Sequence, residues 1–428
     1  MLETILRARH LRRSWRKPIS EMEELQAKKL RSILKHAYCN VPFYHRKFDE
    51  AHIKPDDIKE TGDLGKIPPT TKYEIQRAPL HDVIARNFDV KKCRKDITSG
   101  SSGIPLTTYM SKQAYDFYSA VWTAVFLENG VKLWDKKAIV GDPRTFPERR
   151  SLTEYLGIMP RKHISIFDDT REQLELLKAY RPDIIEGYPS SLSIIADAHR
   201  KQKEGLKPRL VFTHAETLDR QTRKFLTSSF EADLFDYYGS SELSLIAWEC
   251  PEHVGYHINS DCMVTEFLLN GDLVDGGERG EITCTSLVNY AMPLIRYRQG
   301  DFGVPLEGRC ACGKTLPMIK TIEGRADDFL ISLDGRVISP SIFFPYPFRD
   351  FTKIRQFKVI QEKRDQLKIQ LIAEGDPLAK EVLQEAKNEI QKVFGKDMQV
   401  EFEFMDEFER AASGKIKKIE SRCQIRFE

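Results

Sequence analysis

Apolar and polar residues follow three successive patterns along the 428-residue chain. Between about Glu21 and Glu50 the apolar residues recur every three or four positions, which predicts helices, and Pro42 interrupts the pattern. From Lys136 to Arg325, short β-rich runs alternate with helical stretches. These runs are AIVGD, HISIFD, DIIEGY, RLVFTHAE and LFDYYG. Such alternation predicts an α/β domain with largely parallel strands, whose ligands bind in loops at the strand ends.

The pattern changes again after Gly324. The runs IRQFKVIQ, QLKIQLIA and MQVEFEFM alternate at period two, and residues 377–394, before the third run, have helical spacing. This order predicts a small ββαβ unit. We therefore expect a large domain over residues 1–326, with a helical lead-in over 1–95, and a small domain over 327–428. The linker is expected near Asp327.

Composition excludes some classes of protein. Hydrophobic residues make up 41% of the chain and charged residues 31%, and no apolar run is long enough to cross a bilayer. Lys and Arg number 67 against 64 Asp and Glu, so no strong positive field indicates nucleic-acid binding. The N-terminus lacks the apolar core and cleavage site of a secretory signal, so we expect a cytoplasmic protein.

The basic N-terminal stretch MLETILRARHLRRSWRKP is expected to form an amphipathic helix. Its apolar face would consist of Leu2, Ile5, Leu6, Leu11 and Trp15. Such a helix either docks on the protein core or lies on a membrane surface, and docking is the commoner use of an amphipathic helix. Peripheral membrane contact stays open as an alternative.

A run of hydroxyl residues and glycines, TSGSSG, follows an expected strand. Its members are Thr98, Ser99, Gly100, Ser101, Ser102 and Gly103. Glycines let backbone N–H groups approach a phosphate, and hydroxyls add further donors. A P-loop is excluded because Ile104 and Pro105 follow where that motif requires Lys and Ser or Thr. An exposed Ser/Gly turn is the structural alternative.

Four more motifs follow this loop in order. They are YYGSSE at 237–242, YRQGD at 297–301, GRADD at 324–328 and SGKIKK at 413–418. Together the five resemble the ordered core motifs of the adenylate-forming superfamily. The stretch at 30–58, followed by IPPTTK, resembles the branch of phenylacetate–CoA ligases and capsular-polysaccharide-biosynthesis relatives. The resemblance covers nearly the whole chain.

The resemblance implies a fold and an activity. The fold is a large N-terminal α/β domain, with β-sheets and packed helices, plus a small mobile C-terminal α+β domain. The activity is ATP-dependent conversion of a carboxylic acid to an acyl-adenylate with release of pyrophosphate, followed by transfer to CoA. Two alternatives stay open: transfer to an amine, hydroxyl or carrier in capsular polysaccharide biosynthesis, and a degenerate ligase that only binds nucleotide.

Nucleotide-binding roles are implied for several motif residues. An aromatic face suits adenine, so Tyr238 is the expected purine platform, and Gly239 lets the backbone pass close to the nucleotide. Asp301 can accept both ribose hydroxyls, and Arg325 can donate to the sugar or to phosphate. Glu242 is the expected Mg²⁺ ligand. The resemblance adds Tyr237, Ser240, Ala215 and Glu216 to the nucleotide site.

Lys415 matches the mobile lysine of the superfamily. A positive charge that bridges the carboxylate and the α-phosphate stabilises charge that develops in the transition state. Lys415 and Glu242 are therefore the two expected catalytic residues. Because it lies in the small domain, the resemblance implies that domain closure about a hinge at Asp327 completes the site.

A second group of residues has the composition of a zinc site. Cys250, Cys310 and Cys312 supply three thiols, and His253 and His257 are two candidate fourth ligands. By resemblance His257 is the better candidate. Four protein ligands leave no open position, so a structural zinc is predicted. The remaining cysteines receive no role.

Substrate and acceptor are less well defined by the sequence. The acyl pocket is expected between about Tyr109 and Tyr188, where Phe117, Tyr118 and Trp122 are candidates together with the run at 187–190, although all of these also suit packing. The expected partners are a small carboxylic acid and CoA or another acceptor. The stretch DDFLISLDGRVISPS resembles the capsular form, which leaves the acceptor open, and a homodimer is neither predicted nor excluded.

Overall fold

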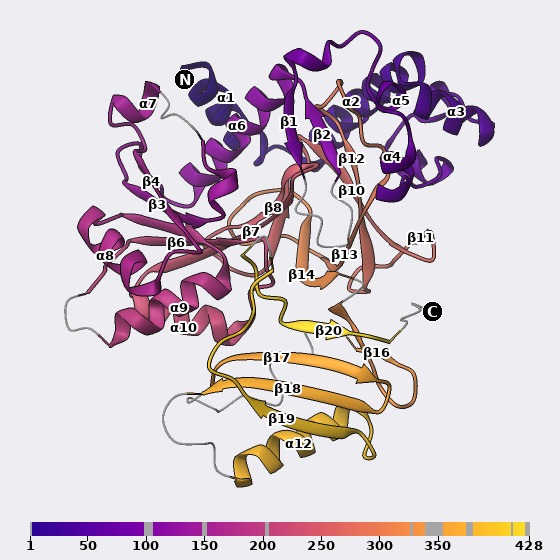
Figure 1. Cartoon of the computed structure of the whole chain (residues 1–428). Coiled ribbons are helices and arrows are strands. Elements are labelled where there is room, and N and C mark those ends of the chain that lie inside the picture. The colour runs from indigo at the N-terminus through magenta and orange to yellow at the C-terminus, as the bar shows by residue number, and fades with distance from the viewer. Residues whose placement is uncertain are drawn as a thin grey trace. The chain divides into compact units, whose positions relative to one another are not determined.

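The computed structural model describes residues 2–97, 106–147, 152–201, 205–325, 328–338, 354–373, 380–411 and 414–423 (Figure 1). Residue contacts divide the chain into two units. Unit 1 comprises Met1–Lys132 and Phe235–Thr321, and unit 2 comprises Leu133–Leu234 and Ile322–Glu428. The expected boundary between residues 326 and 327 divides the chain differently, and it stays a prediction, as does the mobility of the small domain.

Helices fill much of the N-terminal part of unit 1. They are α1 (Leu2–Ser14), α2 (Ile19–Asn40), α3 (Pro42–Glu50), α4 (Lys72–Arg77), α5 (Leu80–Val83) and α6 (Lys112–Glu128), with short 3₁₀ turns at Pro55–Asp57, Thr61–Lys66 and Val90–Lys92. The expected interruption at Pro42 is confirmed, because α2 ends at Asn40 and Pro42 starts α3. Proline suits this first position, since its missing N–H would have no partner within the helix.

The N-terminal helix α1 is docked on unit 1. It packs against α6, and Ala8, Leu11 and Trp15 are buried. The docked alternative from the sequence is therefore the observed one. Leu6 departs from the expected apolar face, because 53% of its surface is exposed.

The strands of unit 1 run in the order β11-β10-β12-β13-β14-β9-β8-β7. Their bounds are β7 Asp233–Ser240, β8 Ser244–Glu249, β9 Tyr256–Ile258, β10 Met263–Leu269, β11 Asp272–Leu273, β12 Gly280–Ser286, β13 Tyr297–Leu306 and β14 Met318–Arg325. The pairs β7–β8, β8–β9, β9–β14, β10–β11, β10–β12 and β12–β13 are antiparallel. The expectation of largely parallel strands is thus wrong for this half of the motif region. The pairs that are consecutive along the chain have connections too short for parallel pairing, which needs a crossover of a dozen or more residues, whereas only 241–243 separate β7 from β8.

Unit 2 contains the parallel part that the sequence predicts. Its strands run β6-β5-β3-β4, and each neighbouring pair is parallel. The elements are β3 (Lys137–Gly141), a 3₁₀ turn (Pro143–Thr145), α7 (Leu152–Tyr155), β4 (Arg161–Ser165), α8 (Thr170–Tyr180), β5 (Ile184–Gly187), α9 (Pro189–Arg200), β6 (Leu210–His214) and α10 (Arg220–Phe230). Apolar residues of the strands and of α8, α9 and α10 form one core, in which Val140, Leu177 and Phe230 are fully buried.

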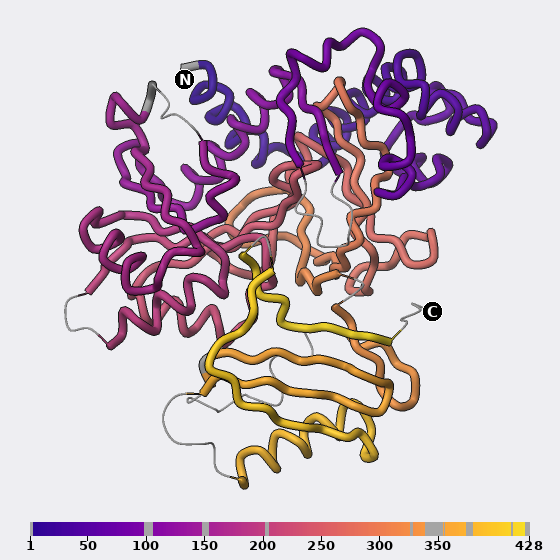
Figure 2. Tube along the Cα trace, in the orientation of Figure 1, coloured from indigo at the N-terminus to yellow at the C-terminus, as the bar shows by residue number. Residues whose placement is uncertain are grey.

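The C-terminal part of unit 2 is a second, smaller sheet with the order β19-β18-β17-β20. Its elements are β15 (Leu330–Ile331), β16 (Val337–Ile338), β17 (Ile354–Lys363), β18 (Gln366–Ala373), α12 (Lys380–Phe394), β19 (Gln399–Phe404) and β20 (Ile419–Ser421). The predicted ββαβ order is confirmed, and α12 covers one face of this sheet (Figure 1). The described parts of the segment between β19 and β20, residues 405–411 and 414–418, extend beyond the sheet (Figure 2). The short strand β20 was not predicted.

Glu128, at the end of α6, is a buried carboxylate that three cations share. It accepts hydrogen bonds from Arg12 and Arg16 of the N-terminal segment and lies 3.0 Å from the ammonium of Lys314. Burial alone would raise the pKa of this carboxyl, but hydrogen bonds from Arg16, Arg12 and Lys314, together with the charge of Lys314, lower its pKa to about 2. The folded protein therefore favours ionised Glu128.

We expect Glu128→Gln to lower the free energy of unfolding by about 3 kcal/mol at pH 7, because it leaves the buried ammonium of Lys314 without its counter-charge. A carboxyl whose pKa is lowered in the folded state stabilises the protein at pH values above its ordinary pKa near 4.5. That contribution is lost as the pH falls toward the folded-state pKa of about 2. The difference between wild type and variant should therefore shrink as the pH falls from about 5 to about 2. Urea unfolding at several pH values measures this.

Glu21→Gln is the matched control, since Glu21 forms an exposed pair with Lys17. We expect this change to shift the free energy of unfolding by less than about 0.5 kcal/mol. A Glu128→Gln effect of the same size at pH 7 and pH 3 would contradict the assigned role of the ionised carboxylate.

Candidate active site and Cys–His cluster

Two groups of predicted residues lie outside the described part of the chain. They are the hydroxyl and glycine run at 98–103 and the predicted hinge Asp327. Strands β1 (Arg94–Ile97) and β2 (Thr107–Met110) flank the run and pair antiparallel, with Ile97 opposite Thr107. The expected strand before the run is therefore present.

The motif YYGSSE forms the end of β7 and the turn that leads into β8. Gly239 has a structural reason to be glycine, because a Cβ at this position would lie 2.3 Å from the carbonyl oxygen of Ser244. The register of the two strands shifts between Tyr238 and Gly239, which produces this close approach. The expected approach of the Gly239 backbone to a nucleotide stays a prediction.

Two predicted nucleotide ligands are in contact within unit 1. The hydroxyl of Tyr238 on β7 donates to Oδ2 of Asp301 on β13 at 2.7 Å. The hydroxyl of Tyr297 donates to Oε1 of Glu242 at 3.2 Å. Residues from YYGSSE and YRQGD thus form two hydrogen-bonded pairs. Tyr297 had no predicted role, although it lies in the quoted motif, because nothing in the sequence shows which partner its hydroxyl meets.

The three aromatic residues of α6 that were predicted for the acyl pocket differ from one another in what they contact. Trp122 contacts the ring of Tyr237 edge-on at 4.7 Å and donates to Oγ of Ser244 at 3.2 Å. Tyr118 is buried with its hydroxyl beside Ser286, and Phe117 lies under the ammonium of Lys29. Trp122 is therefore the α6 aromatic that lies against the YYGSSE motif.

In unit 2, Glu216 follows the end of β6 and faces the start of α9. Its carboxylate accepts hydrogen bonds from the backbone N–H of Ser190 at 3.0 Å and from the hydroxyl of Ser190 at 2.9 Å. It also accepts from the backbone N–H of Ile416 at 3.1 Å. Ala215 has a φ of 67°, an uncommon left-handed conformation for alanine, at the turn that places Glu216 there.

Lys415 lies in the same unit, in the segment that Glu216 contacts. Its ammonium is 5.6 Å from the centre of the Tyr188 ring. The backbone N–H of Arg325 donates to Asp328 at 3.1 Å, and the ammonium of Lys417 lies 3.6 Å from the same carboxylate group. The structure therefore places the end of GRADD beside part of SGKIKK.

A buried charged group that the sequence did not indicate lies at β3, β5 and β6. Lys137 pairs with Glu186 at 2.6 Å, and His214 lies 3.8 Å from the same carboxylate. Burial outweighs the opposing charge of Glu186 and, with the charges of Lys415 and Lys137 as smaller causes, lowers the pKa of His214 to about 4. His214 is therefore neutral at neutral pH. It directly precedes Ala215 and Glu216, which are predicted to contact the nucleotide.

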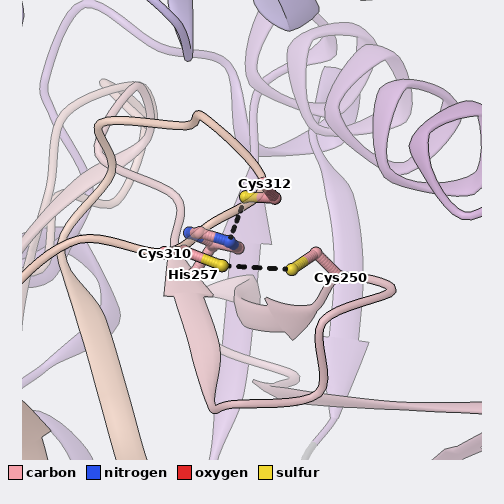
Figure 3. A group of neighbouring side chains, drawn as sticks. All are labelled: Cys250, His257, Cys310 and Cys312. Atoms are coloured by element: carbon pink, nitrogen blue, oxygen red, sulfur yellow. Dashed lines mark hydrogen bonds between the residues drawn. The ribbon is translucent and has the colours of Figure 1, made fainter.

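The predicted metal ligands gather at one place in unit 1. Cys250 follows β8, His257 lies in β9, and Cys310 and Cys312 lie in the turn after β13 (Figure 3). Their ligand atoms all lie within 4.8 Å of one another. His253 is elsewhere, 3.6 Å from Glu249 and beside the ring of Phe235. The geometry thus places His257, not His253, with the three cysteines.

The spacing within this Cys–His cluster suits a tetrahedral ion. The sulfur atoms of Cys250 and Cys310 are 3.6 Å apart, and Sγ of Cys312 is 3.3 Å from Nε2 of His257. A zinc–sulfur distance of about 2.3 Å gives a tetrahedral edge of about 3.8 Å. A disulfide would need about 2.05 Å. The four residues therefore fit one shared cation.

The protonation chemistry of the cluster also fits a cation. Burial lowers the pKa of His257 to about 4, so its imidazole is neutral at neutral pH, which is the ligand form. Burial raises the pKa of Cys250 to about 12 and raises that of Cys310. Burial alone would also raise the pKa of Cys312, but hydrogen bonds, the largest from the backbone of Lys314, outweigh this effect and lower the pKa of Cys312. A bound dication would stabilise the thiolates that burial otherwise disfavours.

The family comparisons fit this fold and these motifs. A family model described as the CapK C-terminal domain matches residues 330–422. Phenylacetate-coenzyme A ligase of Escherichia coli (strain K12) is 30% identical over 337 residues, which are 76% of this chain and 75% of that protein. The enzyme of the same name from Thermus thermophilus is 27% identical over 73% of this chain and 72% of its own length.

Solved structures show the same fold. A 2-hydroxyisobutyryl-CoA ligase in the postadenylation state, in complex with R3-HIB-AMP, has a TM-score of 0.79 at 18% identity and covers 95% of this chain and 91% of its own. The anthranilate CoA ligase AuaEII in complex with anthranoyl-AMP has a TM-score of 0.58 at 15% identity over 83% and 73%. At these identities the likeness concerns the fold alone.

Fold and motifs together define an adenylate-forming ligase, with a large N-terminal and a smaller C-terminal domain. More specifically, the chain belongs to the phenylacetate–CoA ligase family, and it is an AMP-forming acid–CoA ligase. The three residues whose loss would indicate a degenerate member, Glu242, Asp301 and Lys415, are all present. Among the described residues, no helix is both long enough and apolar enough to span a bilayer.

Proposed function

We propose that this enzyme activates a small aromatic carboxylic acid of the phenylacetate type and transfers the acyl group to CoA. The observation that carries the proposal is the pairing of Tyr238 with Asp301 and of Tyr297 with Glu242 in unit 1. These pairs contain an aromatic ring, an acceptor suited to a diol and a carboxylate suited to a metal ion, and Mg-ATP requires groups of these kinds. The relatives named as phenylacetate-coenzyme A ligases support this class of acid.

The reaction has two steps. A carboxylate oxygen of the acid attacks the α-phosphorus of ATP, a new P–O bond forms, and the bond to the β-phosphate breaks to release pyrophosphate. The sulfur of CoA then attacks the acyl carbon, the thiol proton is lost, and the bond to AMP breaks. Charge develops around the α-phosphate in the first step, so cations there lower the barrier.

Each site residue has a proposed role in these steps. Tyr238 stacks on adenine with Tyr237, Gly239 and Ser240 beside it, Asp301 accepts the ribose hydroxyls, and Glu242 binds Mg²⁺. Arg325 and the run at 98–103 bind sugar and phosphate, and Ala215 and Glu216 border adenine. Lys415 bridges the carboxylate and the α-phosphate when the small domain closes about Asp327. Support for these roles comes from the motif matches and from the contacts within each unit.

A second acceptor has specific support. The C-terminal match to the CapK domain covers residues 330–422, which include Lys415. An amine, hydroxyl or carrier on a capsular polysaccharide pathway would use the same adenylate. A cytoplasmic location remains a prediction from the sequence, and a homodimer and contact with a membrane surface remain alternatives that the sequence leaves open.

We also propose that the Cys–His cluster binds one structural Zn²⁺. Three thiolates and one neutral imidazole are a usual ligand set for zinc and leave no position for substrate. The ion would join the turn after β8 to the turn after β13. β8 pairs with β7, which carries Tyr238, and β13 carries Asp301.

Carboxylate-dependent exchange of labelled pyrophosphate into ATP tests the proposed function. We expect exchange with phenylacetate or a related acid, and loss of exchange by about a hundredfold or more in Lys415→Ala. ATP affinity should stay near normal, because the lysine acts on charge formed during the reaction. Lys392→Ala, on α12, is the control and should exchange normally. No exchange with any acid of the panel would refute the proposed function.

Nucleotide recognition gives a separate expectation. Asp301→Ala should weaken ATP binding by roughly 1.5–3 kcal/mol, because the ribose hydroxyls lose a charged acceptor. Tyr238→Phe keeps the ring and removes only the bond that orients Asp301, so it should have a smaller effect. Calorimetry with ATP and with a 2′,3′-dideoxy analogue measures both. If wild type and Asp301→Ala discriminate the sugar equally, Asp301 is not the ribose ligand.

The zinc proposal predicts about one equivalent of zinc in protein purified without chelator, since structural sites retain their metal. His257→Ala and the double change Cys310→Ser with Cys312→Ser should lose the metal. His253→Ala and Cys93→Ser should keep it. Elemental analysis measures the content, and a chelator should lower the melting temperature of wild type and of the two variants that keep zinc, but not of the variants that lose it. Less than about a tenth of an equivalent in wild type would defeat the proposal.

A further inference from the structure

Lys418 belongs to the basic end of SGKIKK but is not a solvated tail residue. Its side chain is 19% exposed, against 47% for Lys417. Its ammonium lies 2.8 Å from Oδ2 of Asp219 and 3.2 Å from the hydroxyl of Thr222. The catalytic proposal for Lys415 does not use this pair.

Asp219 is held in place by hydrogen bonds within its own helix cap, in addition to its contact with Lys418. It is the N-cap of α10, where its side chain accepts from the backbone N–H of Thr222 at 2.8 Å and from the Thr222 hydroxyl at 2.7 Å. Burial would raise the pKa of Asp219, but the charge of Lys418 and these hydrogen bonds lower it. An ionised carboxylate at a helix N-terminus is also favoured by the helix dipole. Asp219 is therefore a fixed anchor.

Glu216 provides a second attachment for the same segment. Its carboxylate lies at the start of α9 and accepts the backbone N–H of Ile416, whose side chain is buried. Arg410 adds a contact to the hydroxyl of Ser191 at 3.1 Å. Two carboxylates at the starts of neighbouring helices thus bind the segment on both sides of residue 417.

Lys415 is directly affected by these attachments. The residue after it, Ile416, is fixed through its backbone, and Lys418 is fixed through its side chain. The carbonyl of Lys418 also accepts from the backbone N–H of Val359, which joins the segment to the sheet at β17. With these points fixed, the Lys415 ammonium has a defined place beside Tyr188.

We propose that Lys418 and Asp219, with Glu216 on the Ile416 backbone, form a latch that positions Lys415 for the adenylation step. This inference rests on the proposed function of Lys415. Lys418 and Asp219 are positioning residues, since they act through the lysine and not on the substrate. The latch serves the first half-reaction alone, because Lys415 bridges groups that exist only while ATP reacts.

The two half-reactions separate this role from general stability. Acyl-adenylate formation is followed with ATP and an acid that wild type accepts, with phenylacetate tested first. Thioester formation is followed with synthetic phenylacetyl-adenylate and CoA. Lys418→Met should slow adenylation about tenfold to a hundredfold through displacement of Lys415, and should change thioester formation less than about twofold. Lys418→Arg should restore most of the adenylation rate.

Asp219→Asn keeps the cap of α10, because asparagine also accepts at this position, and removes the charge. It should reproduce the Lys418→Met effect, and the double variant should be no slower than either single one, since both remove one interaction. Lys392→Met removes an exposed lysine paired with Glu389 and is the control that should change neither half-reaction.

Amide hydrogen exchange in residues 414–418 gives a readout without catalysis. Lys418→Met should make these amides exchange faster than in wild type, and Lys392→Met should not. Equal losses in both half-reactions, additive single effects, or unchanged exchange in this segment would overturn the latch. If wild type forms no adenylate with any acid, the proposed function fails, and amide exchange alone decides whether the contacts hold the segment.

Discussion

The packing of unit 1 depends on the buried carboxylate of Glu128. A buried carboxylate is stable only when counter-charges and hydrogen bonds replace the water it has lost. Here the counter-charges come from segments far apart in sequence, Arg12 and Arg16 near the N-terminus and Lys314 after β13. Because these cations share one carboxylate, α1, α6 and the turn after β13 are constrained together.

Contacts between aromatic rings connect this constrained region to the Cys–His cluster. Trp15 lies 5.0 Å from Trp248, and Trp248 lies 5.3 Å from His257, measured between ring centres. The backbone N–H of Thr315 donates to the carbonyl of Trp15 at 2.8 Å. A cation in the cluster would therefore stiffen a region whose other side is already held by α1. The strands that leave it, β8 and β13, adjoin or carry the proposed nucleotide ligands.

Local patterns predicted the elements that local physics determines. The break at Pro42, the parallel strands β3 to β6 and the ββαβ order all follow from spacing within short windows. The antiparallel half of the motif region was missed, because nearly every position of β8, β10 and β12 is buried, so these strands lack the alternation that marks a strand with one exposed face. The order of motifs indicated Tyr238 and Asp301 as nucleotide ligands but not the hydrogen bond between them, and ligand chemistry indicated the cysteines. Glu128 and Lys418 could not be predicted, since their partners lie more than a hundred residues away.

Glu216 shows why a motif match alone does not define what a residue contacts. The resemblance assigns it to adenine, whereas the structure gives it three protein donors: two from Ser190 and one from Ile416. A carboxylate has about four acceptor positions, so these contacts leave capacity for one further donor, such as the amino group of adenine. The two roles are therefore compatible. A nucleotide bound there would share one carboxylate with the backbone beside Lys415, so ATP binding and the position of that lysine would depend on the same group.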